Sequence, residues 1–281
     1  MRKHESDSYR VCALHRHHDR AKFCPAQRRC RAPHSETDVS PGSSHRRTVP
    51  DGFFLPHPAP RLTTDSLVGQ VLAERPAHLV ALAQHLLQAL VETVVTPLLH
   101  RLVAFCWDLP ASEAHHHSRP FGLLTHSLEV ATHALVAFSQ SSLWWQQAPD
   151  PAQRHRLQPH WRLGTALAGL LHDLGKVFDV TVVLAPANGT LPARWDPLAE
   201  PLLAFLLRHQ QGGRMPTPTV HWQPQRGMRH EAAGALVATL LLTRADLQAL
   251  TLSVARALWV YLGGSPDPAN LFRQLISSPP A

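Results

Sequence analysis

The residues best suited to chemistry are a histidine and an aspartate side by side at the end of an apolar stretch. In ALAGLLHDLGK, residues 166–176, the apolar residues predict a buried helix, and Gly175 is a natural stop for it. His172 and Asp173 then lie where a helix meets a loop, and a neutral imidazole and a carboxylate can both bind one divalent ion there. The carboxylate could also bridge to a second ion. The pair is equally compatible with a helix end that carries a hydrogen-bonded His and a solvated Asp.

A third candidate ligand lies earlier in the chain, in LLTHSLEVATHAL, residues 123–135. His126, Glu129 and His133 share one face of the predicted helix, because they are spaced three and four residues apart. A lone histidine on such a helix is more often part of the core. The second helix with its His-Asp end makes His126 a candidate third ligand.

One lysine stands apart from the other cations of the chain. Lys176 is the only Lys in residues 51–281, where 15 Arg supply the remaining positive charge. A compact ammonium next to a metal site suits a phosphate oxygen. We therefore expect Lys176 to take part in catalysis.

A histidine triplet precedes the helix that carries His126. It lies in the loop-like stretch LPASEAHHHSRPFG, residues 109–122, where Pro and Gly break regular structure. Such a triplet is either solvated or close enough to the candidate ligand to act with it. We expect His116 and His117 to assist Lys176 at a phosphoryl oxygen.

The elements that must position these residues are mostly helices. Apolar residues recur with helical spacing over 77–96, and Pro97 interrupts that pattern. Thr63, Thr64 and Asp65 offer an N-cap for an earlier helix, and the β-branched residues of 177–184 indicate a short extended segment. The expected fold class is all-α, a helical bundle with minor extended segments. Helices are predicted over 77–96, 98–107, 123–139, 161–172, 198–208, 229–243, 245–263 and 269–277.

Composition divides the chain into a tail and a folded domain. Residues 1–60 are rich in His, Arg, Ser and Pro and have no structural period, so we expect a disordered basic tail followed by a domain over 61–281. A misassigned start codon would give the same kind of stretch. Residues 1–50 hold 11 Lys and Arg against 5 Asp and Glu, a net charge of +6. The rest holds 27 − 11 = 16 against 20 − 5 = 15, a net charge of +1, so a strongly basic nucleic-acid-binding globule is not implied.

The sequence predicts a cytoplasmic protein without membrane segments. No apolar run reaches the roughly 18 residues of a membrane span, and the start lacks the apolar stretch of a signal peptide. Cys12, Cys24, Cys30 and Cys106 follow no zinc-ligand pattern, and they do not suggest a disulfide framework.

His126 followed by His172-Asp173, on two apolar helices, resembles the HD-domain superfamily of metal-dependent phosphohydrolases. The longer strings LPASEAHHHSRPFGLLTHSLEVATHAL and ALAGLLHDLGKVFD resemble the TraI-like N-terminal domain of MobH-type conjugative relaxases, which occur on integrative conjugative elements and plasmids. The resemblance implies an HD-domain-like bundle in which His126, His172 and Asp173 bind Mn²⁺, Mg²⁺ or Fe. One or two ions are expected, with Asp173 able to bridge both.

The resemblance also implies a ligand on a later helix. His230, in GMRHEAAGAL, resembles the extra histidine of some two-metal members, and Glu231 could orient it; the alternative is a solvent-facing residue at a helix start. The late aspartate usual in the superfamily has no clear counterpart. Asp267 lies in a turn-forming context, and Asp246 starts a helix but is poorly placed. Either His230 completes the site or the site is weakened.

The predicted function is that of a relaxase-associated phosphohydrolase domain acting on DNA phosphodiesters in conjugation. DNA and conjugative transfer proteins are the expected partners, with no membrane partner and no prediction of oligomeric state. A tyrosine nucleophile is disfavoured, since the chain has only Tyr9 and Tyr261, and no glycine-rich phosphate loop exists. Two alternatives stay open: a phosphodiesterase for nucleotides or cyclic nucleotides, and a catalytically degenerate interaction module of the transfer machinery.

Overall fold

The computed structural model describes residues 62–186, 191–224 and 229–277, with the side chains of 229–231 excepted. All of them belong to one compact unit of the chain, Pro56–Ala281. The expectation of a disordered tail over 1–60 lies outside the described residues.

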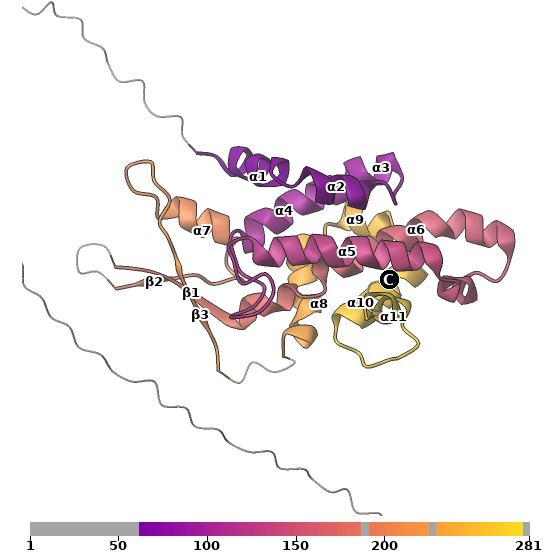
Figure 1. The fold of residues 1–281 in the computed structure, drawn as a ribbon. Coiled ribbons are helices and arrows are strands. Elements are labelled where there is room, and N and C mark those ends of the chain that lie inside the picture. Colours follow the sequence, from indigo (N-terminus) through magenta and orange to yellow (C-terminus); the bar gives the residue numbers. More distant parts are fainter. Residues whose placement is uncertain (1–61, 187–190, 225–228, 278–281) are drawn as a thin grey trace, which may run out of the picture. The chain divides into compact units, whose positions relative to one another are not determined.

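Helices dominate the described chain, and a small sheet lies at one end of the bundle next to α7 (Figure 1). The fold is therefore mostly helical, as the sequence predicts, with a sheet in addition. The elements are α1 (Thr64–Ala73), α2 (Pro76–Ala83), α3 (Gln88–Leu90), the π-helix η1 (Val91–Val95), α4 (Thr96–Cys106), α5 (Gly122–Gln140), the 3₁₀-helix η2 (Leu143–Gln147), α6 (Pro151–Leu171), the 3₁₀-helix η3 (Leu174–Phe178), β1 (Val180–Leu184), β2 (Ala193–Arg194), α7 (Leu202–Arg208), β3 (Thr219–Trp222), α8 (Arg229–Leu241), α9 (Arg244–Gln248), α10 (Leu252–Leu262) and α11 (Leu271–Ile276).

The first helices differ in detail from the sequence prediction. The N-cap is confirmed: Thr63 caps α1 and forms a capping box with Ser66. The single helix expected over 77–96 is wrong, because the chain turns at 84–87 and leaves Leu87 56% exposed. A helix then continues through Pro97. The π-helical turn just before Pro97 allows the helix to continue, because its wider i→i+5 hydrogen bonds accommodate a residue that has no backbone N–H.

The continuous helix Gln88–Cys106 is long and apolar enough, by length and composition, to cross a membrane. Half of its apolar window is buried inside the domain, and core helices of soluble proteins pass the same test. The absence of membrane segments stays a prediction.

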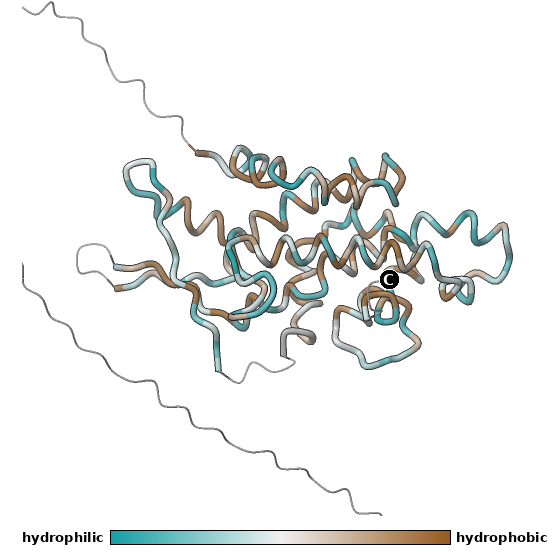
Figure 2. Tube along the Cα trace, in the orientation of Figure 1, coloured by the Kyte–Doolittle hydropathy of each residue, from teal (hydrophilic) through white to brown (hydrophobic). Residues whose placement is uncertain are grey.

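Helices α5 and α6 form the central pair of the fold. α6 begins at Pro151, ten residues before the predicted start, because Asp150 caps its first turn and Pro151 occupies a position where no N–H is needed. Its first half is mostly hydrophilic (Figure 2). Its second half, from Trp161 on, is almost wholly buried. Near the end of α6, a Cβ atom on Gly169 would lie 2.4 Å from the Cα atom of Ala131 on α5. The absence of a side chain at 169 thus sets the close approach of the two helices.

Around this pair, the later helices and the sheet complete the core. α10 and α11 pack on α6, where Val254 and Phe272 lie against Gly164, and α8 packs against η3. The extended segment predicted over 177–184 is a strand only from Val180, since η3 occupies the residues before it. The sheet is antiparallel, in the order β2-β1-β3. Alternate residues of β1 are buried, so one face of the strand packs against the core next to η3.

Candidate metal centre

His172 is held at the end of α6 by its own helix. Its Nδ1 atom lies 2.8 Å from the carbonyl oxygen of Gly169, one turn earlier. A carbonyl can only accept a hydrogen bond, so Nδ1 carries a proton and donates it. The neutral form of the ring then has its lone pair on Nε2. This is the usual arrangement of a metal-binding histidine, in which a second partner fixes ring and tautomer.

Asp173 follows at once and lies at the N-terminus of η3. Its Oδ2 atom lies 3.0 Å from the Nε2 atom of His126 and 3.3 Å from the Nε2 atom of His172. Lys176, one turn along η3, donates to the same oxygen at 2.6 Å. A single carboxylate oxygen is therefore the point on which two imidazoles and an ammonium converge.

The three candidate ligands lie within coordination distance of one another. The Nε2 atoms of His126 and His172 are 3.2 Å apart, and the ligand atoms of both with Asp173 all lie within 4.8 Å. Ligands about 2.1 Å from one ion in tetrahedral or octahedral geometry are roughly 3.0–3.4 Å apart. The three measured separations, 3.0, 3.2 and 3.3 Å, fall in this range. The side chains thus fit a shared cation.

Electrostatics keep Asp173 in the form that binds a cation. Burial alone would raise its pKa, but the polar contacts with His126 and His172, together with the positive charge of Lys176, outweigh burial and lower the pKa far below its usual range. The three ligand side chains are only 12–28% exposed. The centre is therefore an ionised carboxylate between two imidazoles in a partly dry environment.

The structure places His117 next to this cluster and leaves His116 apart from it. The His117 ring lies 5.4 Å from the His126 ring, and its Nε2 atom contacts Glu129 at 3.0 Å. The other carboxylate oxygen of Glu129 lies 3.6 Å from His78. His117 has a positive φ of 61°, and its carbonyl accepts the Ala111 N–H, so the loop holds a strained conformation. The His116 side chain is exposed, and it forms no hydrogen bond or ion pair with the described residues of the cluster.

None of the three late candidates, His230, Asp246 and Asp267, adds a described ligand. His230 lies in the first turn of α8, but its side chain, like that of Glu231, lies outside the described residues. Asp246 is buried elsewhere: Arg101 donates to its Oδ2 atom at 2.6 Å, and the backbone N–H of Thr243 donates to the same atom. Its carboxylate thus accepts hydrogen bonds from a helix N-cap residue and from an arginine. Asp267 caps a turn by accepting the Ala269 N–H.

Sequence reasoning missed one group of residues near the centre. A cavity of about 130 Å³ is bounded by His172 and Asp173 and by residues of α10, α11 and their connection. The sequence gives no sign of a role for Tyr261, which lies far along the chain, and Arg273 shows no signal beyond being a cation in a predicted helix. The other lining residues are Leu262, Gly264 and Ser277.

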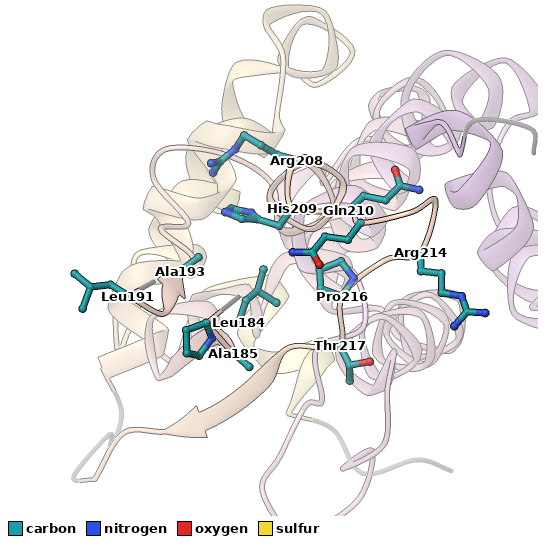
Figure 3. A pocket seen from close by; sticks show the side chains of 12 residues that line it. Leu184, Ala185, Leu191, Ala193, Arg208, His209, Gln210, Arg214, Pro216 and Thr217 are labelled. Atoms are coloured by element: carbon teal, nitrogen blue, oxygen red, sulfur yellow. The ribbon is translucent and has the colours of Figure 1, made fainter. Parts of the chain in front are cut away.

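A larger hollow of about 590 Å³ lies away from the cluster, between the β1–β2 end of the sheet and the segment after α7 (Figure 3). Arg208, His209 and Arg214 line it with several Gln and apolar residues. Arg208 is paired with Glu200, and Nδ1 of His209 is bonded to the Phe205 carbonyl oxygen. None of the cluster residues lines this hollow, so its size alone gives it no role in the chemistry.

Fold and cluster together define a mostly helical domain whose His126, His172 and Asp173 could bind a metal ion. The family model TraI_2, described as "Putative helicase", matches residues 56–276. The chain therefore belongs to the TraI_2 family, which confirms a TraI-like domain. No curated protein matches the chain.

Proposed function

We propose that the chain is a metal-dependent phosphohydrolase domain of the HD type, belonging to a conjugative relaxase and acting on DNA phosphodiesters. The observation that carries this proposal is the convergence of two imidazole nitrogens and one carboxylate oxygen at 3.0–3.3 Å. The TraI_2 match supports the conjugative context. DNA and proteins of the transfer machinery are accordingly the proposed partners, and the cytoplasm the proposed location.

His126, His172 and Asp173 would hold the ion, which supplies Lewis acidity and a bound water of lowered pKa. Two imidazoles with one carboxylate suit Mn²⁺ or Fe better than Mg²⁺, which prefers oxygen ligands. The Gly169 carbonyl orients the His172 ring. A second ion would require further ligands, for which His230 remains the proposed residue.

Lys176 is the residue best placed to neutralise charge on a phosphoryl oxygen. Its side chain is 21% exposed and its ammonium is bonded to Asp173 at 2.6 Å, so the ammonium can contact a group bound at the cluster without a large movement. His117, fixed by Glu129, lies on the His126 side and is better placed than His116 to hold or move a proton. Lys176 and His117 are thus the proposed catalytic pair, with His116 in a lesser role.

Two alternatives remain. A nucleotide phosphodiesterase would use the same metal-dependent hydrolysis, whereas a degenerate interaction module would have no catalytic activity. The absence of a described late aspartate ligand favours the module. Strand separation driven by nucleoside triphosphates gains no support, because this sequence has no glycine-rich phosphate loop.

The decisive experiment combines metal content with hydrolysis of bis-p-nitrophenyl phosphate by the full chain. We expect about one or two ions per chain in the unaltered protein. The His172→Ala/Asp173→Ala variant should lose the bound metal and should also lose hydrolysis. His133→Ala is the matched control, since His133 lies exposed on the same helix as His126. Hydrolysis that persists unchanged in the double variant would refute the assignment. Single-stranded DNA and cyclic dinucleotides, offered in parallel, separate the two enzyme hypotheses.

A further inference from the structure

The small cavity beside the cluster has two walls of different origin. His172 and Asp173 form one wall, and the end of α10, the following turn and α11 form the other. Tyr261, Arg273 and Ser277 supply the side chains of the second wall that can donate hydrogen bonds, and Arg273 alone among them carries a positive charge. The mechanism above uses none of these residues.

Arg273 is fixed in this wall but is not neutralised. It lies on α11, which Asn270 caps and which buries Phe272 and Leu275 in the core. Its Nη2 atom donates to the Ser265 carbonyl oxygen at 2.7 Å, which fixes the guanidinium plane.

The guanidinium of Arg273 forms no ion pair with a carboxylate among the described residues. The Nε atom of Arg273 is buried and has no hydrogen-bond partner among the described residues. Among the described residues, the arginines that form ion pairs are Arg75, Arg101 and Arg208, and Arg273 is not one of them. No described carboxylate neutralises Arg273, so its guanidinium brings an uncompensated positive charge to the cavity wall, and such a charge favours an anionic ligand.

Size narrows the class of ligand. The cavity, at about 130 Å³, is smaller than the roughly 300–1,000 Å³ of pockets that hold whole drug-sized ligands. It can take a single tetrahedral anion or one phosphoryl group of a larger molecule. Guanidinium groups bind phosphate oxygens in pairs, because their planar donors match the spacing of the oxygens.

We propose that this cavity is the subsite for a phosphoryl group of the substrate, in which Arg273 binds the phosphate oxygens and Tyr261 contributes its hydroxyl. This inference rests on the proposed function, since the same group would face the cation held by His172 and Asp173. Arg273 and Tyr261 are then binding residues that determine specificity for phosphate, supplied by segments about a hundred residues beyond the ligands.

The test titrates inorganic phosphate into the full chain by calorimetry, with Mn²⁺ affinity measured separately. Arg273→Gln should weaken phosphate binding roughly 10- to 100-fold and leave Mn²⁺ affinity unchanged. Tyr261→Phe should weaken phosphate binding by a smaller factor. Arg162→Gln is the matched control, because Arg162 also donates to a backbone carbonyl oxygen, that of His85, away from the cavity. Phosphate affinity in Arg273→Gln equal to that of the unaltered chain would overturn the subsite.

A second measurement needs no variant and therefore does not depend on folding. Phosphate should slow the modification of Arg273 by phenylglyoxal in the unaltered chain, read by peptide mass spectrometry, and should not protect Arg162. Equal modification of Arg273 with and without phosphate overturns the subsite. Absence of Mn²⁺ binding contradicts the proposed function instead, and protection of Arg273 by phosphate without added metal would still support the subsite.

Discussion

The Nδ1 atom of His172 is bonded to the carbonyl oxygen of Gly169, and Gly169 is also a residue at which α6 approaches the backbone of α5 closely. Gly169 thus serves the metal centre in two ways. Its carbonyl orients a ligand ring, and its missing side chain lets the helix that carries His126 approach. The geometry of the cluster therefore depends on a residue that cannot bind a metal through a side chain.

Gly169→Ala should disturb this relationship. The added Cβ atom would lie 2.4 Å from Cα and 2.7 Å from N of Ala131, both backbone atoms, so α5 and α6 must move apart. We expect a stability loss of about 1–3 kcal/mol and weaker Mn²⁺ binding, measured by thermal unfolding and calorimetry. Gly69→Ala, where nothing lies within 4 Å, should instead gain up to about 1 kcal/mol. A fully stable Gly169→Ala variant with unchanged Mn²⁺ affinity would contradict the argument.

Lys176→Gln should separate catalysis from metal binding. The substitution removes the ammonium beside Asp173 but none of the three ligand atoms. Hydrolysis of bis-p-nitrophenyl phosphate should fall by roughly 10²–10³-fold while metal content stays the same. Arg244→Gln, at the start of α9, serves as the control for loss of one positive charge. If metal is lost together with activity, Lys176 has a structural role.

Asp246→Ala tests whether this late aspartate belongs to the fold or to the centre. The substitution leaves Arg101 without its carboxylate and removes the cap partner of Thr243. The Asp246 side chain is 3% exposed and that of Arg101 is 31% exposed. We therefore expect the free energy of unfolding, measured by chemical denaturation, to fall by about 2–4 kcal/mol. Metal content should not change below the unfolding transition. A folded variant that has lost its metal would show that Asp246 serves the centre.

Asp108 gives the domain a specific dependence of stability on pH. Burial raises the pKa of its carboxyl, partly offset by a backbone hydrogen bond, and its Oδ1 atom is buried without a partner among the described residues. Since the folded pKa is raised, the native state favours the protonated form. The resulting stability is present below the unfolded pKa of about 3.9 and is lost as pH rises through the folded pKa.

Asp108→Asn should accordingly be more stable than the unaltered protein at pH 7, with the difference shrinking toward pH 3. Thermal unfolding at a series of pH values measures this. The control is Asp65→Asn, in the first turn of α1, which should give no such gain at pH 7. A pH-independent difference for Asp108→Asn would mean that packing, and not ionisation, controls the site.

Local signals in the sequence were sufficient to predict most of the helices and the three residues His126, His172 and Asp173 of the cluster. Periodic apolar residues predicted most helices, because burial of one face is a property of neighbouring residues along the chain. The same reasoning failed at 84–87, where the chain turns, and at Pro97, which a preceding π-helical segment allows the helix to include. It also missed the early start of α6, although Asp150 and Pro151 are ordinary start signals.

The sequence by itself determined that His172 and Asp173 end a buried helix and that His126 lies on another. Their types and spacing, which are local facts, fixed which side chains could bind a metal. Only the tertiary structure decided that their atoms meet at 3.0–3.3 Å, that Asp246 pairs with Arg101 and that Arg273 borders the same cavity. These relationships join segments tens to over a hundred residues apart, and packing of the helices, which no local pattern encodes, brings them together.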